Sequence, residues 1–343
     1  MLQVSDLHIQ FDTDAGVVHA VRGVSFDVQK GETLAIVGES GCGKSVLCKG
    51  LLGLLPPNAH VTQGEVRLKG QTLTQLSEKA LCAVRGRRIA MVFQDPQSAL
   101  DPSMSIGGQL VESIRCGRRC TRREAYEQAV AWLQRVGIDH AKARMHEHAC
   151  ALSGGMRQRC VIAMALCQSP DVLVVDEPTT ALDVTVQAQI LSLLRALQRE
   201  TGVAIVFITH DLSVVAQIAH RVAVMYAGQV VEMGTVQDVF YDPRHPYTWG
   251  LLAALPQAQA RGKLFSIPGA PPDLLRPMTG DAFAPRNPYA LNIDFAKAPP
   301  AFAVSETHWA RTWLLHPDAP RVECPVCVRD GRVHVAESGW SHG

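Results

Sequence analysis

The segment Gly38-Glu39-Ser40-Gly41-Cys42-Gly43-Lys44-Ser45 restricts the fold of this chain more than any other, because it matches the phosphate-loop pattern G-x-x-x-x-G-K-S/T. It follows the almost entirely apolar run 33–37, which is typical of a strand covered on both faces, and it precedes a helix-like segment at 46–55. Chance alone places these four fixed positions in on the order of one per cent of chains this long. Strand, glycine loop and helix in this order predict the start of a parallel α/β core.

The residue types of the loop suit a nucleotide phosphate. Glycines let the backbone curl so that successive N–H groups point at phosphate oxygens, and the helix N-terminus adds a partial positive charge. Lys44 is expected to neutralise the β- and γ-phosphates, and Ser45 to offer its hydroxyl to Mg²⁺. Cys42 has two interpretations: a thiol of lowered pKa that reacts with alkylating agents when nucleotide is absent, or a small residue at a variable position.

Two carboxylates follow a second apolar run, 172–175. Asp176 and Glu177 are therefore expected at the carboxyl end of a buried strand, where open α/β sheets bind their ligands. Asp176 is suited to hold a metal ion through its water shell, and Glu177 to polarise the attacking water as general base. The alternative is that both are ordinary solvated acids closing a strand.

The segment Leu152-Ser153-Gly154-Gly155-Met156-Arg157-Gln158-Arg159 is the most diagnostic stretch, because it resembles the signature of ABC-type ATPases. Ser153, Gly154 and Gly155 open a helix-like segment and leave N–H donors for an anion. In that family the signature closes over the γ-phosphate bound to the partner subunit. By itself, Ser-Gly-Gly is also compatible with a simple helix cap.

The resemblance implies roles for further residues. Gln94 resembles the residue that touches metal and water and reports the nucleotide state to transmembrane subunits. Ala181-Leu182-Asp183 resembles the loop that crosses the dimer interface, and His210 resembles the γ-phosphate sensor. Phe11 stands where the family places an aromatic ring that stacks on adenine, although a Phe beside a strand is often a core residue.

The predicted fold class is α/β: an ABC-type phosphate-loop nucleotide-binding domain at 1–260, with a parallel core sheet, an antiparallel β edge and a helical subdomain inserted at about 101–165. The β edge is expected from the alternating runs 4–9 and 24–28, and a βαβ unit from a helix-like stretch at 184–200 between two apolar runs. A loop-rich C-terminal extension is expected at 261–343, because 11 of the 20 prolines lie between Pro268 and Pro325.

The resemblance narrows to one branch of the family. The segment Arg244-His245-Pro246-Tyr247-Thr248 resembles the element after the ATPase core in oligopeptide and dipeptide importers and their nickel-importing relatives; 266–269 and 283–286 continue the match. Met156, with Ala163-Met164-Ala165-Leu166, resembles the first of the two non-identical ATPases of those systems. An ATPase that energises import of di- or oligopeptides is thus implied, with nickel or another small solute as the alternative.

The extension departs from the family pattern at a metal site. Relatives carry four cysteines there that hold an iron–sulfur cluster, and the matching positions here are Asp281, Asn287, Asp294 and Thr312. Oxygen and amide groups do not replace thiolates for such a cluster, so no conventional cluster is expected. Cys324 and Cys327 form a lone C-x-x-C, which with His316 and His334 is either a metal site or an unligated tail.

Charge and hydropathy restrict the cellular setting. Lys+Arg 33 against Asp+Glu 32 leaves a net charge of +1, so no broad basic field is expected to grip nucleic acid. The first residues lack the features of a signal peptide, and the apolar runs are too short to span a bilayer. We therefore expect the chain to stay in the cytosol, with its ten cysteines mostly reduced. The resemblance to ABC importers implies a peripheral subunit on the cytoplasmic face of the cell membrane.

The resemblance also implies the cofactors and partners: ATP and Mg²⁺, a homologous second ATPase that forms a heterodimer with this chain, two transmembrane permease subunits and an extracytoplasmic substrate-binding protein. A soluble ABC ATPase that remodels nucleic acid or ribosomes would need a coiled-coil insertion, a second cassette or a basic face, and none is visible in the sequence. A regulator that binds nucleotide without hydrolysis is disfavoured by the presence of Lys44, Asp176, Glu177 and His210.

Overall fold

The computed structural model describes residues 1–117, 119–180, 182–255, 266–276, 278–329 and 332–335. The chain divides into two compact units. Unit 1 consists of Met1–Leu2, Asp27–Thr33 and Arg67–Ile208, and unit 2 consists of Gln3–Phe26, Leu34–Val66 and Thr209–Gly343. Each unit is therefore built from separate stretches of sequence. The predicted boundary between residues 260 and 261 lies outside the described residues.

Unit 1 contains three neighbouring parallel strands in the order β8-β7-β6. They are β6 (Ile89–Val92), β7 (Val172–Asp176) and β8 (Ala204–Thr209), and all of their residues are buried, as their apolar composition requires. The helix α8 (Val184–Thr201) connects β7 to β8. The predicted βαβ unit is thus confirmed.

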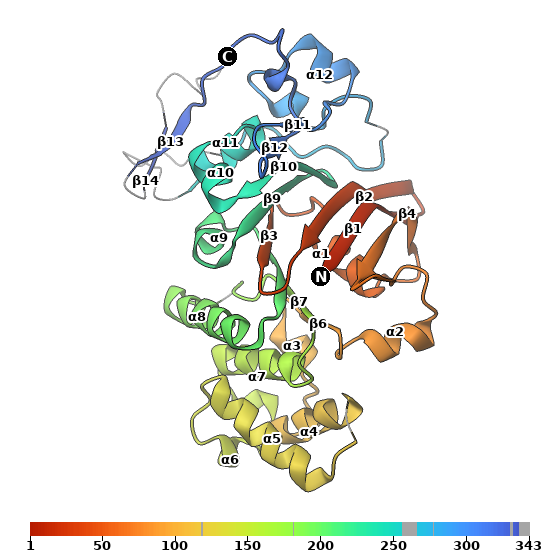
Figure 1. Ribbon diagram of the computed structural model, residues 1–343, viewed down its shortest axis with the longest axis vertical. Coiled ribbons are helices and arrows are strands. Elements are labelled where there is room, and N and C mark those ends of the chain that lie inside the picture. Colours follow the sequence, from red (N-terminus) through yellow and green to blue (C-terminus); the bar gives the residue numbers. More distant parts are fainter. Residues whose placement is uncertain (118, 181, 256–265, 277, 330–331, 336–343) are drawn as a thin grey trace. The chain divides into compact units, whose positions relative to one another are not determined.

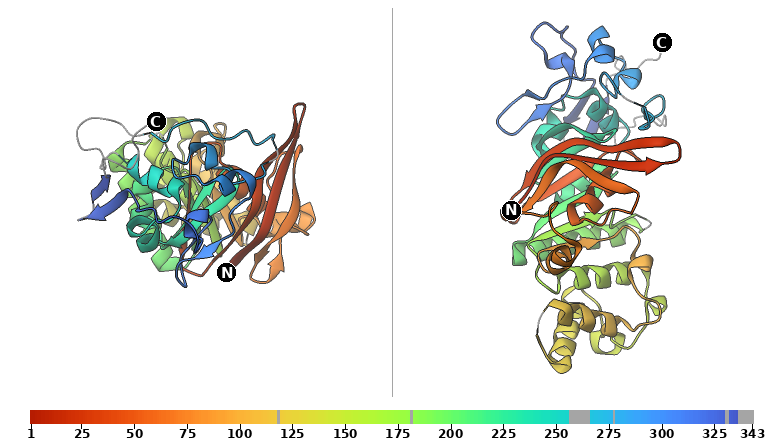
Figure 2. Two further views of the ribbon diagram at one scale, coloured as in Figure 1. Left: turned by 90° about the horizontal axis from the view of Figure 1, so that it is seen from above. Right: turned by 90° about the vertical axis from the view of Figure 1, so that its right-hand side faces the viewer.

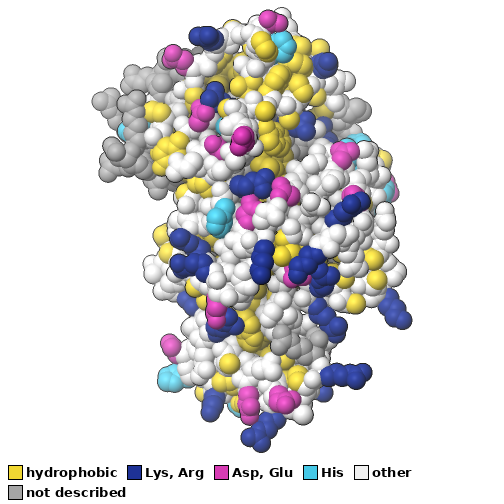
Figure 3. All heavy atoms as spheres, in the orientation of Figure 1, with side chains coloured by type: hydrophobic (Ala, Val, Ile, Leu, Met, Phe, Trp, Pro, Cys, Tyr) yellow, Lys and Arg dark blue, Asp and Glu magenta, His cyan; other side chains and the backbone are white. Residues whose placement is uncertain are grey.

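The helical part of unit 1 follows β6 in the chain. Its longer helices are α4 (Ile106–Gly117), α5 (Arg122–Arg135) and α7 (Gly154–Leu166), and the shorter elements of the unit are β5 (Gln71–Thr72), α2 (Glu78–Val84), α3 (Pro96–Ala99), α6 (Ala141–Arg144) and η1 (Ala149–Ala151). The helix α5 begins with a capping box, in which Thr121 and Glu124 each accept the other's backbone N–H. Figure 1 shows α4, α5 and α6 in yellow, and at the same end of Figure 3 acidic and basic side chains are mixed on the surface. The predicted helical insertion with solvated faces is confirmed.

The first sheet of unit 2 has the strand order β2-β1-β4. The strands are β1 (Leu2–Thr13), β2 (Gly16–Val28) and β4 (Ala59–Leu68), and the two-residue connection at 14–15 reverses the chain between the first two. The red pair β1 and β2 lies beside the orange β4 in Figure 2. Both strands predicted for this edge are present, and both are longer than the alternating runs that indicated them.

The second sheet of unit 2 joins the phosphate-loop strand to the C-terminal half of the chain. Its strand order is β11-β12-β10-β9-β3. β3 (Thr33–Val37) runs parallel to β9 (Arg221–Tyr226), which pairs antiparallel with β10 (Gln229–Thr235). β12 (Trp309–Ala310) and β11 (Phe302–Ala303) then extend the sheet in antiparallel pairs.

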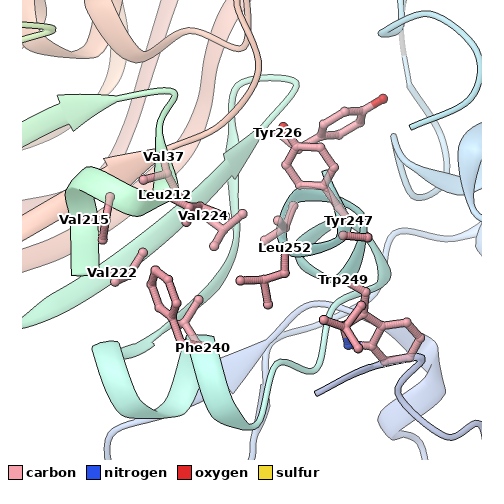
Figure 4. Packing of buried hydrophobic residues seen from close by; sticks show 14 of the residues in the cluster. Val37, Leu212, Val215, Val222, Val224, Tyr226, Phe240, Tyr247, Trp249 and Leu252 are labelled. Carbon is pink, nitrogen blue, oxygen red and sulfur yellow. The ribbon is translucent and has the colours of Figure 1, made fainter. Parts of the chain in front are cut away.

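Hydrophobic side chains of this sheet pack against three helices of unit 2. These helices are α9 (Leu212–Ile218), α10 (Val236–Tyr241) and α11 (Pro246–Ala253). Figure 4 shows Val224 and Tyr226 of β9 beside Tyr247 and Leu252 of α11. The rings of Tyr226 and Tyr247 have centroids 4.6 Å apart, and Phe283 packs edge-on against Tyr226 at 5.2 Å. Phe283 of the C-terminal extension is therefore part of the core of unit 2.

The described part of the C-terminal extension consists of short elements joined by loops. They are η3 (Ala284–Arg286), α12 (Asn292–Ala296), η4 (Trp313–Leu315), β13 (Val326–Arg329) and β14 (Arg332–Val335), in addition to β11 and β12. The prediction of a loop-rich extension is confirmed for these residues. Among all described helices, none combines the length and the hydropathy that crossing a bilayer requires.

Candidate functional site

The phosphate loop lies in unit 2 between β3 and α1 (Lys44–Leu52). The predicted helix at 46–55 is present but begins two residues earlier and ends three residues earlier. It ends at Leu52 because Gly53 adopts the left-handed conformation, with φ 65°, and its N–H caps the last turn. Gly43 at the N-cap has φ 102°, and a Cβ there would lie 2.3 Å from the carbonyl oxygen of Ala20. The loop therefore requires glycine at this fixed position.

Lys44 is buried within the loop that it is predicted to serve. It is 4% exposed, and its Nζ donates to the carbonyl oxygens of Gly38 at 2.7 Å and Glu39 at 2.8 Å. A buried ammonium group needs such acceptors, and phosphate oxygens are acceptors of the same kind. Ser40 and Gly41 are exposed on the loop, and Ser45 stands in the first turn of α1.

The prediction of a lowered thiol pKa at Cys42 is wrong. Cys42 is 5% exposed, and burial raises its pKa although nearby Lys44 acts in the opposite direction. Its Sγ occupies the space beside Gly38, where an added Cβ would meet it at 2.8 Å. The alternative of a small residue that fills the loop describes Cys42 correctly.

Two side chains that sequence analysis did not connect with the loop contact Glu39. The Tyr247 hydroxyl accepts the Glu39 N–H at 2.8 Å, and the guanidinium of Arg286 pairs with the Glu39 carboxylate. Both residues lie in segments that sequence analysis had singled out. The pairing itself has no local sequence signal, because Glu39 and Arg286 are 247 positions apart.

The carboxyl end of β7 in unit 1 carries the two predicted acids. Asp176 is the last residue of the strand and is 4% exposed. Glu177 has φ 43°, which is uncommon for a residue with a side chain, and its N–H donates to Ile208 of β8 at 3.0 Å. Its carboxylate accepts from Gln94 Nε2 at 3.2 Å and from the Thr180 hydroxyl at 2.9 Å. Strained backbone of this kind gathers at functional sites.

The structure brings Gln94 and Glu177 together because β6 and β7 are adjacent and parallel. Gln94 follows β6 and is exposed, and the next residue, Asp95, caps α3 by accepting the N–H groups of Gln97 and Ser98. The turn that was the alternative interpretation of this segment is thus present as well. Thr180 is a contact that sequence analysis missed, and its only signal was its position three residues after Glu177.

The signature segment and the Asp183 loop adjoin each other in unit 1. Ser153 caps α7 by accepting the Met156 N–H at 3.4 Å, and Asp183 caps α8 by accepting the Val186 N–H at 2.9 Å. A Cβ added at Gly155 would lie 2.7 Å from Val186 Cγ1, whereas one at Gly154 would meet Leu182 at an ordinary 3.5 Å. Ala181 of this loop lies outside the described residues.

His210 and Phe11 are both accessible in unit 2. His210 is exposed directly after β8, before the Asp211 cap of α9, and Phe11 is partly exposed on β1. These positions do not test the predicted γ-phosphate and adenine contacts, which stay predictions.

The four positions that match the family's cluster cysteines use their oxygens in local turns. Each accepts a nearby backbone N–H: Asp281 from Phe283, Asn287 from Tyr289, Asp294 from Leu291, and Thr312 from Leu314. This donor set does not fit an iron–sulfur cluster. Within the described ranges, no group of three or more His, Cys, Asp or Glu residues is placed to hold a metal ion. Cys324 is exposed as a residue, but neighbouring groups desolvate its thiol and raise its pKa to about 11, which disfavours the thiolate that a metal would need.

Comparison with protein families gives two matches in succession along the chain. The model described as ABC transporter matches residues 21–180, and that described as oligopeptide/dipeptide transporter, C-terminal region, matches residues 231–293. An AAA-domain model also matches residues 148–216.

Curated relatives match nearly the whole chain. The oligopeptide transport ATP-binding protein OppD of Bacillus subtilis is 53% identical over 332 residues, covering 96% of this chain and 93% of that protein. AmiE of Streptococcus pneumoniae, also an oligopeptide transport ATP-binding protein, is 53% identical over 345 residues, with 100% and 97% covered. The dipeptide transport ATP-binding protein DppD of Lactococcus lactis is 53% identical over 324 residues, with 94% and 93% covered.

Solved structures match the fold over 69% of the chain. The ATP-binding cassette MJ0796, in a dimeric post-hydrolysis state bound to ADP and Pi, has a TM-score of 0.62 and 26% identity, with 99% of that chain covered. CbiO1 of Clostridium perfringens, part of an ABC transporter complex, has a TM-score of 0.59 and 29% identity, with 89% of that chain covered.

Proposed function

Since this chain belongs to the family of ATP-binding subunits of oligopeptide and dipeptide ABC transporters, we propose that it binds and hydrolyses ATP to power the uptake of di- or oligopeptides across the cytoplasmic membrane. The observation that carries the proposal is the hydrogen-bonded Gln94–Glu177 pair at the end of β7 in a chain that also has an intact phosphate loop. The full-length identity of 53% to oligopeptide and dipeptide transport proteins supports the choice of peptide as cargo.

The described residues supply the groups that ATP hydrolysis needs. We assign the β- and γ-phosphates to Lys44 and to the N–H groups of the loop, and the role of γ-phosphate sensor to His210. Glu177 polarises the attacking water, and its bonds to Gln94 and Thr180 fix the direction of the carboxylate. Phe11 is assigned to adenine.

The oxygen groups of Ser45, Gln94 and Asp176 are of the kind that Mg²⁺ prefers, and we assign that ion to them. When bound, Mg²⁺ would neutralise charge on the phosphates. No step is assigned to an iron–sulfur cluster.

We propose that the active form is a pair of cassettes face to face, and the dimeric state of MJ0796 with ADP and Pi supports this arrangement. Ser153, Gly154 and Gly155 of one cassette complete the γ-phosphate site of the other, and Asp183 belongs to the loop at the interface. Binding of ATP closes the pair and hydrolysis reopens it.

A homologous second ATPase, two permease subunits and an extracytoplasmic binding protein complete the transporter, with this chain peripheral on the cytoplasmic side. Residues 1–260 form the ATPase domain and 261–343 its extension.

Uptake by the assembled transporter tests the proposal. The chain is reconstituted with its second ATPase, permeases and binding protein in proteoliposomes, and accumulation of labelled di- and oligopeptides is measured with phosphate release. We expect ATP-dependent accumulation that is lost in the Glu177→Gln variant. Accumulation of a nickel chelate without any peptide would contradict peptide as the cargo, and the absence of phosphate release would contradict the function as a whole.

A further inference from the structure

Glu39, the second residue of the phosphate loop, is held by a two-point ion pair within unit 2. Arg286 Nη1 donates to Glu39 Oε2 at 2.6 Å, and Arg286 Nη2 donates to Glu39 Oε1 at 2.9 Å. This fork geometry is the strongest form of the Arg–carboxylate contact. The Arg286 side chain is 5% exposed and that of Glu39 is 25% exposed, so water screens the pair weakly.

Arg286 has further partners that fix its position independently of Glu39. Its Nε donates to the carbonyl oxygen of Pro268 at 2.8 Å, Nη2 to that of Ile267 at 3.3 Å, and Nη1 to the Tyr226 hydroxyl at 3.2 Å. Burial opposes the charge, but the hydrogen bonds to Glu39 and Tyr226 raise the pKa of Arg286 above its usual value. Glu39 is therefore tied to a fixed cation that stays charged.

The backbone of Glu39 is held by one residue of the C-terminal half of the chain and by one residue of the loop itself. Its N–H donates to the hydroxyl of fully buried Tyr247 at 2.8 Å, and its carbonyl oxygen accepts from Lys44 Nζ at 2.8 Å. The position of Glu39 thus sets the position of an acceptor on which Lys44 rests. A shift of Glu39 would change the starting geometry of the lysine that is assigned to the phosphates.

Charge gives a second reason for the pair. The loop binds a polyanion, and a carboxylate within it repels that ligand unless a cation compensates it. Arg286 is the cation that contacts the Glu39 carboxylate, and it is supplied by the extension, far from the loop in sequence.

We propose that Arg286 is a positioning residue for nucleotide binding, which neutralises Glu39 and holds the phosphate loop in its binding geometry. The described residues of the segment 266–286 are then a working part of the ATP site in addition to being part of the core. This inference rests on ATP binding by the loop and does not depend on which solute is transported. If Arg286 only held the extension in place, nucleotide affinity would not depend on the charge of Glu39.

Nucleotide affinity of the full-length chain separates these roles. Titration calorimetry with MgATP and MgADP is carried out on the wild type, Arg286→Ala, Arg286→Lys, Glu39→Gln and the double variant Arg286→Ala with Glu39→Gln. We expect Arg286→Ala to raise Kd for both nucleotides about tenfold, since it leaves the Glu39 carboxylate uncompensated. Arg286→Lys keeps the charge without the fork and is expected to lie between the wild type and Arg286→Ala.

The decisive measurement is whether the double variant recovers the nucleotide affinity that Arg286→Ala loses. With Glu39→Gln the double variant should recover most of the lost affinity, and in the assembled ATPase Arg286→Ala should raise KM for ATP more than it lowers kcat. Arg276→Ala is the matched control, because Arg276 lies in the same segment, 85% exposed, and pairs with Asp273. A double variant no better than Arg286→Ala, or a Tm loss with unaltered Kd, would overturn the proposal.

Two further outcomes, a variant that does not fold and a wild type that does not bind ATP, have a separate interpretation. If Arg286→Ala does not fold, an Arg286→Lys variant with wild-type Kd would overturn the proposal, and a raised Kd rescued by Glu39→Gln would support it. If the wild-type chain itself binds no ATP, the proposed function fails, whereas normal binding by both the wild type and Arg286→Ala removes only this inference.

Discussion

The side-chain amide of Gln94 donates to the carboxylate of Glu177 over 3.2 Å, although 83 positions separate the two residues. The contact exists because each residue follows one of two adjacent parallel strands, whose carboxyl ends meet at the same edge. All of the helical segment from α3 to α7 lies between them in the chain. Gln94 thus joins the start of that segment to the residue assigned as general base.

Replacing Glu177 by Gln should abolish hydrolysis and leave ATP binding intact. The amide has nearly the shape of the carboxylate but cannot accept a proton from water, so steady-state phosphate release by the assembled pair should fall by about 10²- to 10⁴-fold. Nucleotide affinity is measured in parallel by calorimetry.

A suitable control is Glu127→Gln, because Glu127 is an exposed acid on α5 that pairs with Arg123. Undiminished phosphate release in Glu177→Gln would remove Glu177 from its assigned role.

Replacing Lys44 by Ala should weaken ATP binding by about ten- to a hundredfold, the loss expected when charge-assisted hydrogen bonds to a ligand are removed. Stability should change less, because the carbonyl oxygens of Gly38 and Glu39 that accept from Lys44 belong to a loop that water can reach at Ser40 and Gly41. Calorimetry measures the affinity and thermal unfolding measures the stability. The exposed Lys142 of α6 supplies the control Lys142→Ala, and equal affinities for both variants would contradict the role of Lys44.

Local patterns predicted most of the elements that carry the site. An apolar strand, a glycine loop and a helix, or an apolar strand ended by two acids, are features of neighbouring residues, and β3, α1, β7 and α8 were all predicted from them. The helix α1 ends before the predicted residue, because apolar Leu54 and Leu55 continue the helical pattern past Gly53, whereas the left-handed conformation of Gly53 ends the helix.

Properties set by distant residues could not be predicted in this way. The pKa of Cys42 depends on burial, and the loop around it is enclosed by Ala20 of β2 and Met225 of β9. The pairing of Glu39 with Arg286 likewise exists only after the extension has packed onto the loop. The sequence around Cys42 allowed a reactive thiol, and the sequence around Glu39 indicated no particular contact. The packing of distant segments determines the interactions of both residues.

Adding a methyl group at Gly155 should destabilise unit 1, because its Cβ would lie 2.7 Å from Val186 Cγ1. We expect Gly155→Ala to lower the free energy of unfolding by about 1–3 kcal/mol, as overpacking usually does. Gly154→Ala is the matched variant, since its Cβ would meet Leu182 at 3.5 Å. Denaturant unfolding compares the two.

The clash can be tested directly by removing its partner. Val186→Ala in the Gly155→Ala background should restore part of the lost stability, because it deletes the methyl groups that the new Cβ would meet. Equal stability of Gly154→Ala and Gly155→Ala would show that the start of α7 is not held against α8 as the structure describes.

Cys42 should react slowly with alkylating agents near neutral pH. Burial raises its pKa and limits access to its Sγ, so the thiolate is scarce and shielded. Mass spectrometry after brief treatment with iodoacetamide should find the exposed Cys116 modified well before Cys42. Faster modification of Cys42 than of Cys116 in the nucleotide-free protein would contradict the buried position of this thiol.

Asp281 should make the stability of the chain depend on pH. Burial raises its pKa from 3.8 to about 6, with Asp294 adding to the effect, although a hydrogen bond from the Phe283 N–H acts against it. Between these two values the folded state binds the proton more tightly than the unfolded state, so the contribution of Asp281 is most favourable below pH 4 and is lost as the pH rises through 6.

Asp281→Asn keeps the acceptor for Phe283 and removes the charge. It should therefore raise the free energy of unfolding at pH 8 by about 2–3 kcal/mol relative to the wild type and have little effect at pH 4. Denaturant unfolding at both pH values measures this difference, and Asp318→Asn, at a side chain 92% exposed, is the control. A wild-type protein that is as stable as Asp281→Asn at pH 8 would mean that the Asp281 carboxylate is better solvated than its half-buried position indicates.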